Sequence, residues 1–179
     1  MAAGAKTRRE LLAPAPMGTD VARLQRLMRL EMLVLYAYDH VLVSPVLPAS
    51  AKPAVAQMRG HEQAHVAALG AQLTARHAAT PSAPPSLTIA NRYLARRRIG
   101  GRLGHLRGPK DALFLLLSLE RVAIGAYFVA LREMVDPGLI GLAAQIMASD
   151  SQHEAIISVA LNPGDIPAAV PYGLIQGVQ

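Results

Sequence analysis

The chain of 179 residues contains no cysteine. This absence excludes a disulfide framework and any metal site built on thiolates, so an iron or zinc site in this protein must use oxygen and nitrogen ligands. It leaves the cellular compartment undecided. At this length the chain falls within the range of a single domain and is long enough to bury a sizeable core.

Aromatic residues are also scarce. The chain has no tryptophan, two phenylalanines and five tyrosines, while 52% of its residues are hydrophobic. Alanine, leucine, arginine and methionine recur instead, and all four favour helices. Long alternating runs of β-branched residues, which indicate half-buried strands, are missing. The sequence therefore predicts an all-α fold.

Long apolar runs without charge are missing as well. The most apolar segment, 112–131, has Glu120 and Arg121 at its centre, where a bilayer would penalise both charges, so we interpret it as a buried bundle helix and expect no membrane span. Near the N-terminus, Arg8 and Arg9 resemble the start of a twin-arginine export signal, but a proline-containing stretch follows where such a signal needs an apolar one. We expect a flexible basic arm over 1–18 and a cytoplasmic protein.

What the chain does contain is one pattern twice. The first copy reads Leu30-Glu31-x-x-x-Leu35-x-Ala37-Tyr38 and later Glu62-x-x-His65; the second reads Leu119-Glu120-x-x-x-Ile124-x-Ala126-Tyr127 and later Asp150-x-x-His153. The interval from Glu31 to Glu62 is 31 residues, and that from Glu120 to Asp150 is 30. The pattern predicts two helix–turn–helix units of nearly equal length.

Each of four expected helices carries one carboxylate in the middle of an apolar stripe. The helices are expected at about 20–43, 50–77, 110–135 and 139–160, with Thr19 or Asp20 as the cap of the first. No arginine or lysine shares these stripes, so a bound cation is the simplest compensation for the buried charge. Residues three apart project to the same side of a helix, so a carboxylate and an imidazole at that spacing can meet one ion. The predicted two-metal ligands are Glu31, Glu62, His65, Glu120, Asp150 and His153.

The second and third long helices are joined by a connector of about 78–109, interrupted by prolines and glycines and containing a short helical piece near 89–98. It is far longer than the usual two to eight residues between neighbouring bundle helices. A connector of this size can return the chain along the whole bundle. The expected organisation is a bundle over 19–160 and an extended tail over 161–179.

With these six residues in order and this crossover, the chain resembles the ferritin-like superfamily of di-iron and di-manganese carboxylate proteins over about 20–160. The resemblance implies a four-helix bundle that binds two iron ions, or manganese instead. It also implies terminal ligands at Glu31 and Glu120, bridging carboxylates at Glu62 and Asp150, and one histidine on each metal. Asp150 departs from the usual glutamate of the family, and Glu154, one turn on, is an alternative to it.

Simpler interpretations exist for several of these residues. Taken singly, Glu62 with His65, or Glu120 with Arg121, could form an exposed pair on a helix surface. Tyr38 and Tyr127, each seven residues after a predicted ligand, are either core residues with satisfied hydroxyls or redox-active neighbours of the metals. The remaining histidines lack a partner pattern and are expected to be exposed: His40, His61, His77 and His105.

The positive charge is concentrated in the crossover. Of 18 basic residues, seven lie between positions 92 and 110 without an acid among them, which leaves 11 against 12 acids elsewhere. This stretch is either a soluble connector or a surface for nucleic acid, anionic lipid or an acidic partner. The candidate anion-binding residues are Arg92, Arg96, Arg97, Arg98, Arg102 and Arg107.

Two classes of function are implied by the resemblance. The first is a di-metal oxidoreductase that acts on dioxygen, peroxide or ferrous iron, with an RNA-directed hydroxylase that uses the basic crossover as a variant of it. The second is a non-enzymatic stress-protection or binding protein of the same fold. In either class we expect a homo-oligomer, most simply a dimer.

Overall fold

The computed structural model describes residues 17–165, and the arm and most of the tail lie outside this range. Four long helices, α2 (Met17–Val43), α3 (Lys52–Ala75), α5 (Pro109–Glu133) and α6 (Pro137–Leu161), form a bundle, and a short helix α4 (Leu87–Arg96) lies in the connector between α3 and α5. No strand occurs in the described part of the chain. The predicted all-α bundle with a crossover between its second and third long helices is confirmed.

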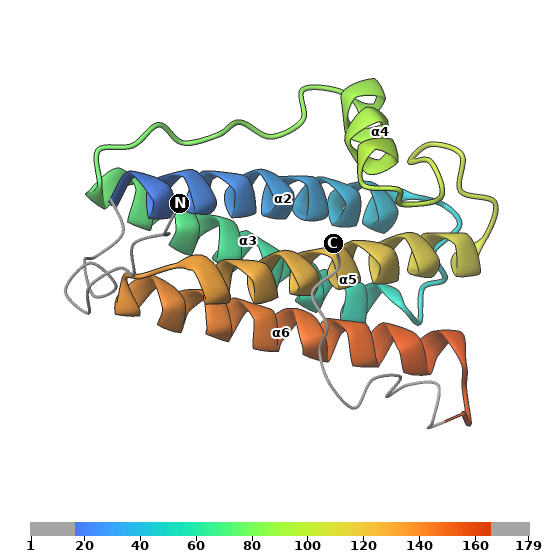
Figure 1. Ribbon diagram of the computed structural model, residues 1–179. Helices are drawn as coiled ribbons and strands as arrows, with labels where there is room; N and C mark the ends of the chain where they lie inside the picture. The colour runs from blue at the N-terminus through green and yellow to red at the C-terminus, as the bar shows by residue number, and fades with distance from the viewer. Residues whose placement is uncertain (1–16, 166–179) are drawn as a thin grey trace, which may run out of the picture.

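Helices α2 and α3 form one antiparallel pair and α5 and α6 the other (Figure 1). The crossover runs along the outside of α2 and brings α4 against that helix, so the chain passes from one end of the bundle to the other before α5 begins. Asn91 of α4 holds the bend after it: its side-chain amide donates to the carbonyl oxygen of Leu103 (3.1 Å) and accepts from the Leu103 amide (2.8 Å). The connector is therefore an ordered part of the fold.

The expectation that Thr19 or Asp20 caps the first helix is wrong. Helix α2 already begins at Met17, and Asp20 lies in its first turn. The buried carboxylate of Asp20 accepts hydrogen bonds from the backbone amides of Val135 (3.2 Å) and Asp136 (3.0 Å) instead. Asp20 thus ties the start of α2 to the turn between α5 and α6, because that turn has unpaired amides that need an acceptor.

The hydrophobic core is divided into two clusters. One fills the end of the bundle near Tyr38, Leu94 and Leu116, and the other fills the opposite end near Leu24, Leu73 and Leu139. The predicted ligands sit at positions of the four long helices between these two clusters. Apolar packing on both sides therefore holds a layer of polar side chains at mid-bundle.

Candidate metal centre

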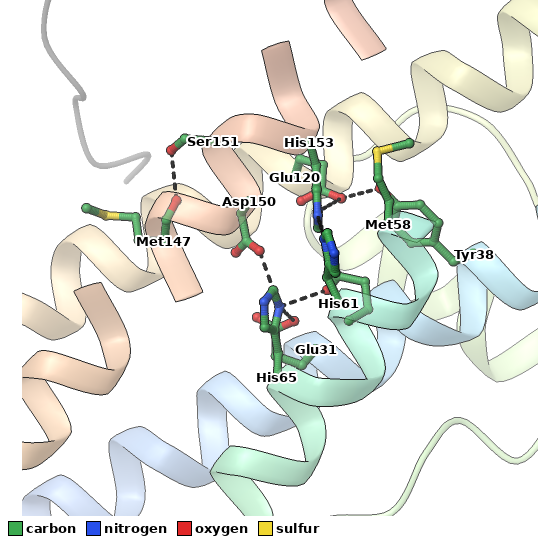
Figure 2. A network of polar contacts seen from close by, with 11 residues as sticks. Glu31, Tyr38, Met58, His61, His65, Glu120, Met147, Asp150, Ser151 and His153 are labelled. Carbon is green, nitrogen blue, oxygen red and sulfur yellow. Dashed lines mark hydrogen bonds and ion pairs between the residues drawn. The ribbon is translucent and has the colours of Figure 1, made fainter. Parts of the chain in front are cut away.

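All six predicted ligands meet in one place in the middle of the bundle. Figure 2 labels each of them except Glu62. Each long helix contributes at least one of them. The four carboxylates have no solvent-exposed surface, and the exposed fractions of the two histidines are 8% and 1%. The residues are Glu31 from α2, Glu62 and His65 from α3, Glu120 from α5, and Asp150 and His153 from α6.

The centre has two halves that share Glu62. Glu31, Glu62 and His65 can bring one ligand atom each within 4.8 Å of one another, and so can Glu62, Glu120, Asp150 and His153. Glu62 therefore lies between the two histidines: its Oε2 is 3.5 Å from Nδ1 of His65, and its Oε1 is 2.9 Å from Nδ1 of His153.

Asp150 faces the same space from the other side of the centre. Its Oδ1 lies 3.4 Å from Nδ1 of His65, although Asp150 itself belongs to the half that contains His153. Asp150 is therefore close to the histidines of both halves. Glu154, the alternative to Asp150, points elsewhere, since its Oε1 lies 2.8 Å from Nε of Arg121.

The donor atoms of this centre have few polar partners other than one another. Both oxygens of Glu31, Glu62 and Asp150, Oε2 of Glu120 and Nδ1 of both histidines are buried, and their polar neighbours are other members of the six. Four carboxylates and two imidazoles with free ligand atoms form a set of oxygen and nitrogen donors that suits iron or manganese. A buried set of this kind costs free energy unless a cation or protons neutralise it, so the residues present fit a pair of divalent ions.

The pKa values of the metal-free centre reflect the same free-energy cost of buried charge. Burial raises the pKa of Glu31 to about 8 and that of Glu120 to about 7, and it also places the pKa of Asp150 well above its usual value. Burial acts on Glu62 in the same direction, but contacts with His153 and His65 outweigh it and lower the pKa of Glu62 to about 2. Without metal, protons therefore neutralise most of the carboxylates.

The two histidines are the positive partners in that state. Burial would lower the pKa of each imidazole, but the neighbouring glutamates outweigh it, Glu31 and Glu62 for His65 and Glu120 and Glu62 for His153. The pKa of both rings rises to about 9. A metal ion that binds here must displace these protons, so binding and proton release are coupled.

Tyr38 and Tyr127 lie at matching positions of the two repeats, and each lies close to the glutamate of the other repeat. The hydroxyl of Tyr38 on α2 donates a short hydrogen bond to Oε1 of Glu120 on α5. Tyr127 on α5 lies near Glu31 on α2; its pKa is raised by burial first and by the charge of Glu31 next. Both rings are fully buried. Both are core residues and neighbours of the centre. The hydroxyl of Tyr38 is satisfied as expected, but that of Tyr127 is buried without a hydrogen-bond partner in the described structure.

His61 is the residue of the centre that the sequence interpretation missed. It is exposed, as expected, but its Nδ1 lies 2.9 Å from Nε2 of His153, and the two rings stack at 14° with centroids 5.2 Å apart. His153 is thus held at both nitrogens, by Glu62 on one side and by His61 on the other. No comparable contact reaches the outer nitrogen of His65 in the described structure. The sequence does contain an indication of this role, because His61 precedes His65 by four residues and therefore lies on the same side of α3.

We expect His61→Leu to weaken metal binding, because it removes the group that fixes the ring orientation of His153. Loss of such an outer partner typically costs about 10–100-fold in metal affinity. His61→Gln retains a hydrogen-bond acceptor and should recover most of the loss. Calorimetric titration with Mn²⁺ measures the metal affinity of both variants. His105→Leu is the control, because His105 is also an exposed histidine. Equal affinities in all these proteins would show that His61 has no part in the centre.

The predicted anion-binding arginines lie apart from the metal centre, in α4 and the bend after it. Arg92, Arg96, Arg98, Arg102 and Arg107 are exposed and Arg97 is half-buried. Arg107 forms an ion pair with Asp111 (3.1 Å). The others have no acidic partner among residues 17–165. Of the other histidines, His77 and His105 are exposed as expected, whereas His40 is half-buried.

Helix α5 is long and apolar enough to cross a membrane by length and composition alone. Over its most apolar stretch, 56% is buried inside the bundle, and the buried residues include Glu120. Core helices of bundles pass the same test, so the interpretation of α5 as a bundle helix needs no membrane.

The fold and this centre define a class: a four-helix bundle with a long crossover and an internal layer of carboxylates and histidines. The model of the ferritin-like domain family matches residues 19–163, and the chain belongs to that family. Comparison with curated proteins and with solved structures gives no significant match.

Proposed function

We propose that this protein is a di-iron carboxylate oxidoreductase that reacts with dioxygen, peroxide or ferrous iron, with manganese as the alternative metal. The observation that carries the proposal is the buried set of four carboxylates and two histidines, most of whose ligand atoms have polar neighbours only within the set. A stress-protection protein without metal would gain nothing from this set, because buried carboxylates without a cation destabilise the fold.

The six ligands would bind the pair of ions, with Glu62 and Asp150 placed between the two halves. When bound, a pair of iron ions supplies one-electron redox chemistry to a small oxidant. The chain's own residues exclude bulk water through the apolar clusters on both sides, and Tyr38 holds one oxygen of Glu120 through its hydroxyl. His61 orients the ring of His153. His65 is the most exposed of the ligands, so the oxidant would approach from its side.

Metal content and reactivity test this proposal directly. The purified chain, loaded anaerobically with ferrous iron, should hold two irons by elemental analysis and should consume dioxygen as the visible absorbance of ferric iron rises. A chain that is fully helical by circular dichroism but retains no iron or manganese after loading would contradict the proposal and favour the non-enzymatic class. Binding of manganese alone would identify the alternative metal.

We expect Asp150→Glu to raise the affinity for the second metal and the rate of ferrous oxidation. Aspartate is one methylene shorter than glutamate, and one carbon–carbon bond of about 1.5 Å is large on the scale of metal–ligand distances. Asp150→Asn should lower both quantities, because an amide oxygen is a weaker donor for these ions than a carboxylate. Metal titration and stopped-flow absorbance on the same preparations measure the two effects.

The control for this comparison is Glu154→Gln, which removes a carboxylate from the same helix without touching the centre. It should leave the number of bound metals unchanged. Identical behaviour of the parent and both Asp150 variants would show that Asp150 is not a ligand.

The basic crossover remains a predicted surface for an anionic partner such as RNA. Its exposed arginines support that prediction, but Tyr93 is the one aromatic residue among them and is half-buried. Single-stranded nucleic acids bind strongly where bases stack on aromatic side chains. Salt-dependent binding of transfer RNA, lost in a variant without Arg92, Arg98 and Arg102, would establish the RNA-directed variant of the function. The dimer and the cytoplasmic location also remain predictions.

A further inference from the structure

A groove between α2 and α5 combines an apolar floor with a basic rim. Its volume is about 430 Å³, within the range of small-molecule sites, which is about 300–1,000 Å³. None of the six residues of the metal centre lines it, so a ligand bound in this groove would be independent of the proposed function. The floor is formed by Leu27, Leu30, Val122, Ala126, Val129 and Ala130.

The charge on the rim changes along the groove. At one end, Arg23 is neutralised by Asp20 (3.2 Å) and Glu133 (3.0 Å). Arg26 and Arg29, further along α2, have no acidic partner in the described part of the chain. Two carboxylates therefore face one guanidinium at the Glu133 end, and the rim is positive beyond it.

A second cavity of about 580 Å³ opens beside the groove, between α2, α4 and the segment 81–84. Arg29 and Arg97 line both cavities, and Arg96 and Tyr93 line the second one as well. The guanidinium of Arg97 is half-buried and donates to the carbonyl oxygen of Tyr93 (3.3 Å), and its other donors have no partner among residues 17–165. A half-buried guanidinium attracts an anion more strongly than an exposed one, because water screens it less.

We propose that this groove binds a long-chain fatty acid, with its carboxylate between Arg29 and Arg97 and its aliphatic chain along the apolar floor. Guanidinium groups bind carboxylates through paired hydrogen bonds, and the floor gains free energy when an aliphatic chain covers it. A small anion would leave the floor exposed. A second copy of this chain would bring its own unpaired arginines against the same rim, and the groove itself offers no aromatic ring for a nucleic-acid base.

Binding of oleate to the full-length protein, below the micelle concentration, tests this proposal by calorimetry. We expect saturable binding of one oleate per chain. The methyl ester of oleate should bind at least about tenfold more weakly to the unchanged protein, because it lacks the charge that the arginines recognise. Octanoate should also bind weakly, since it covers less of the floor.

The matched variants are Arg29→Gln with Arg97→Gln, and Arg92→Gln with Arg102→Gln. Both pairs remove two positive charges, but only the first lines the groove. Oleate affinity should fall about tenfold or more in the first pair and less than about twofold in the second. An equal loss in both pairs, equal binding of oleate and its ester, or no binding would overturn the proposal. Binding to anionic phospholipid vesicles without binding of free oleate would also overturn it and indicate a membrane surface, and a dimer that excludes oleate would indicate a second copy in the groove.

Discussion

Replacing both His65 and His153 by alanine should abolish stoichiometric iron binding while leaving the helices intact. The two histidines are the only nitrogen donors among the six clustered residues, and each half of the centre contains one of them. We expect the affinity to fall by more than about 100-fold, beyond the cost of losing an outer partner such as His61. Alanine is the best helix former, so the long helices α3 and α6 should persist.

The measurement is elemental analysis after anaerobic loading and gel filtration, with circular dichroism on the same samples. His77 and His105 provide the control, because both are exposed and neither belongs to the centre. Their double replacement by alanine should leave two irons per chain. If the variant without His65 and His153 also retains two irons, the assignment of the ligands is wrong.

The ligand layer could be predicted from sequence because it is a local property of each helix. A carboxylate in the middle of an apolar stripe is visible within one or two turns, and the spacing of Glu62 and His65 places both on one side of a helix without further knowledge. The repeat then relates one half of the chain to the other. Convergence of all six residues follows from these local patterns once the helices pack along their apolar stripes.

Contacts between distant segments could not be predicted in this way. Asp20 resembles a helix cap in sequence, but its partners lie more than 110 residues away in the turn before α6. The contact of His61 with His153 spans 92 residues and depends on how closely α3 and α6 approach. Arg97 lines the same groove as Arg29 because α4 packs on α2. Periodicity indicates which face of a helix is buried, but not which exposed residues of different helices become neighbours.

The metal-free protein should lose stability as the pH rises from about 5 to 9. Glu31 and Glu120 have pKa values near 4.5 when unfolded and about 8 and 7 when folded, and those of His65 and His153 rise from 6.5 to about 9. The folded chain therefore binds more protons than the unfolded chain throughout this window, and such stability is lost as the pH rises through the folded pKa values.

Glu62 behaves in the opposite way, since its pKa is lowered to about 2, but its contribution is lost only below pH 4.5. Between pH 5 and 9, these groups therefore all change the stability of the folded protein in the same direction. Each unit of pKa shift corresponds to about 1.4 kcal/mol, so the total change should be on the order of several kcal/mol after allowance for coupling between the groups. Relief of the net charge of +6 at higher pH would act in the reverse direction, which makes the sign of the change informative.

Bound metal should reverse this dependence. The ions replace the protons on the same ligands, so their affinity rises with pH and the stabilisation they add grows with it. Scanning calorimetry between pH 5.5 and 9, with chelator or with Mn²⁺, should show the two melting temperatures moving apart. Glu31→Gln with Glu120→Gln should flatten the curve of the metal-free protein, because two of the titrating groups are gone. A melting temperature of the metal-free parent that stays level or rises across this range would mean that these side chains are not buried together in a charged layer.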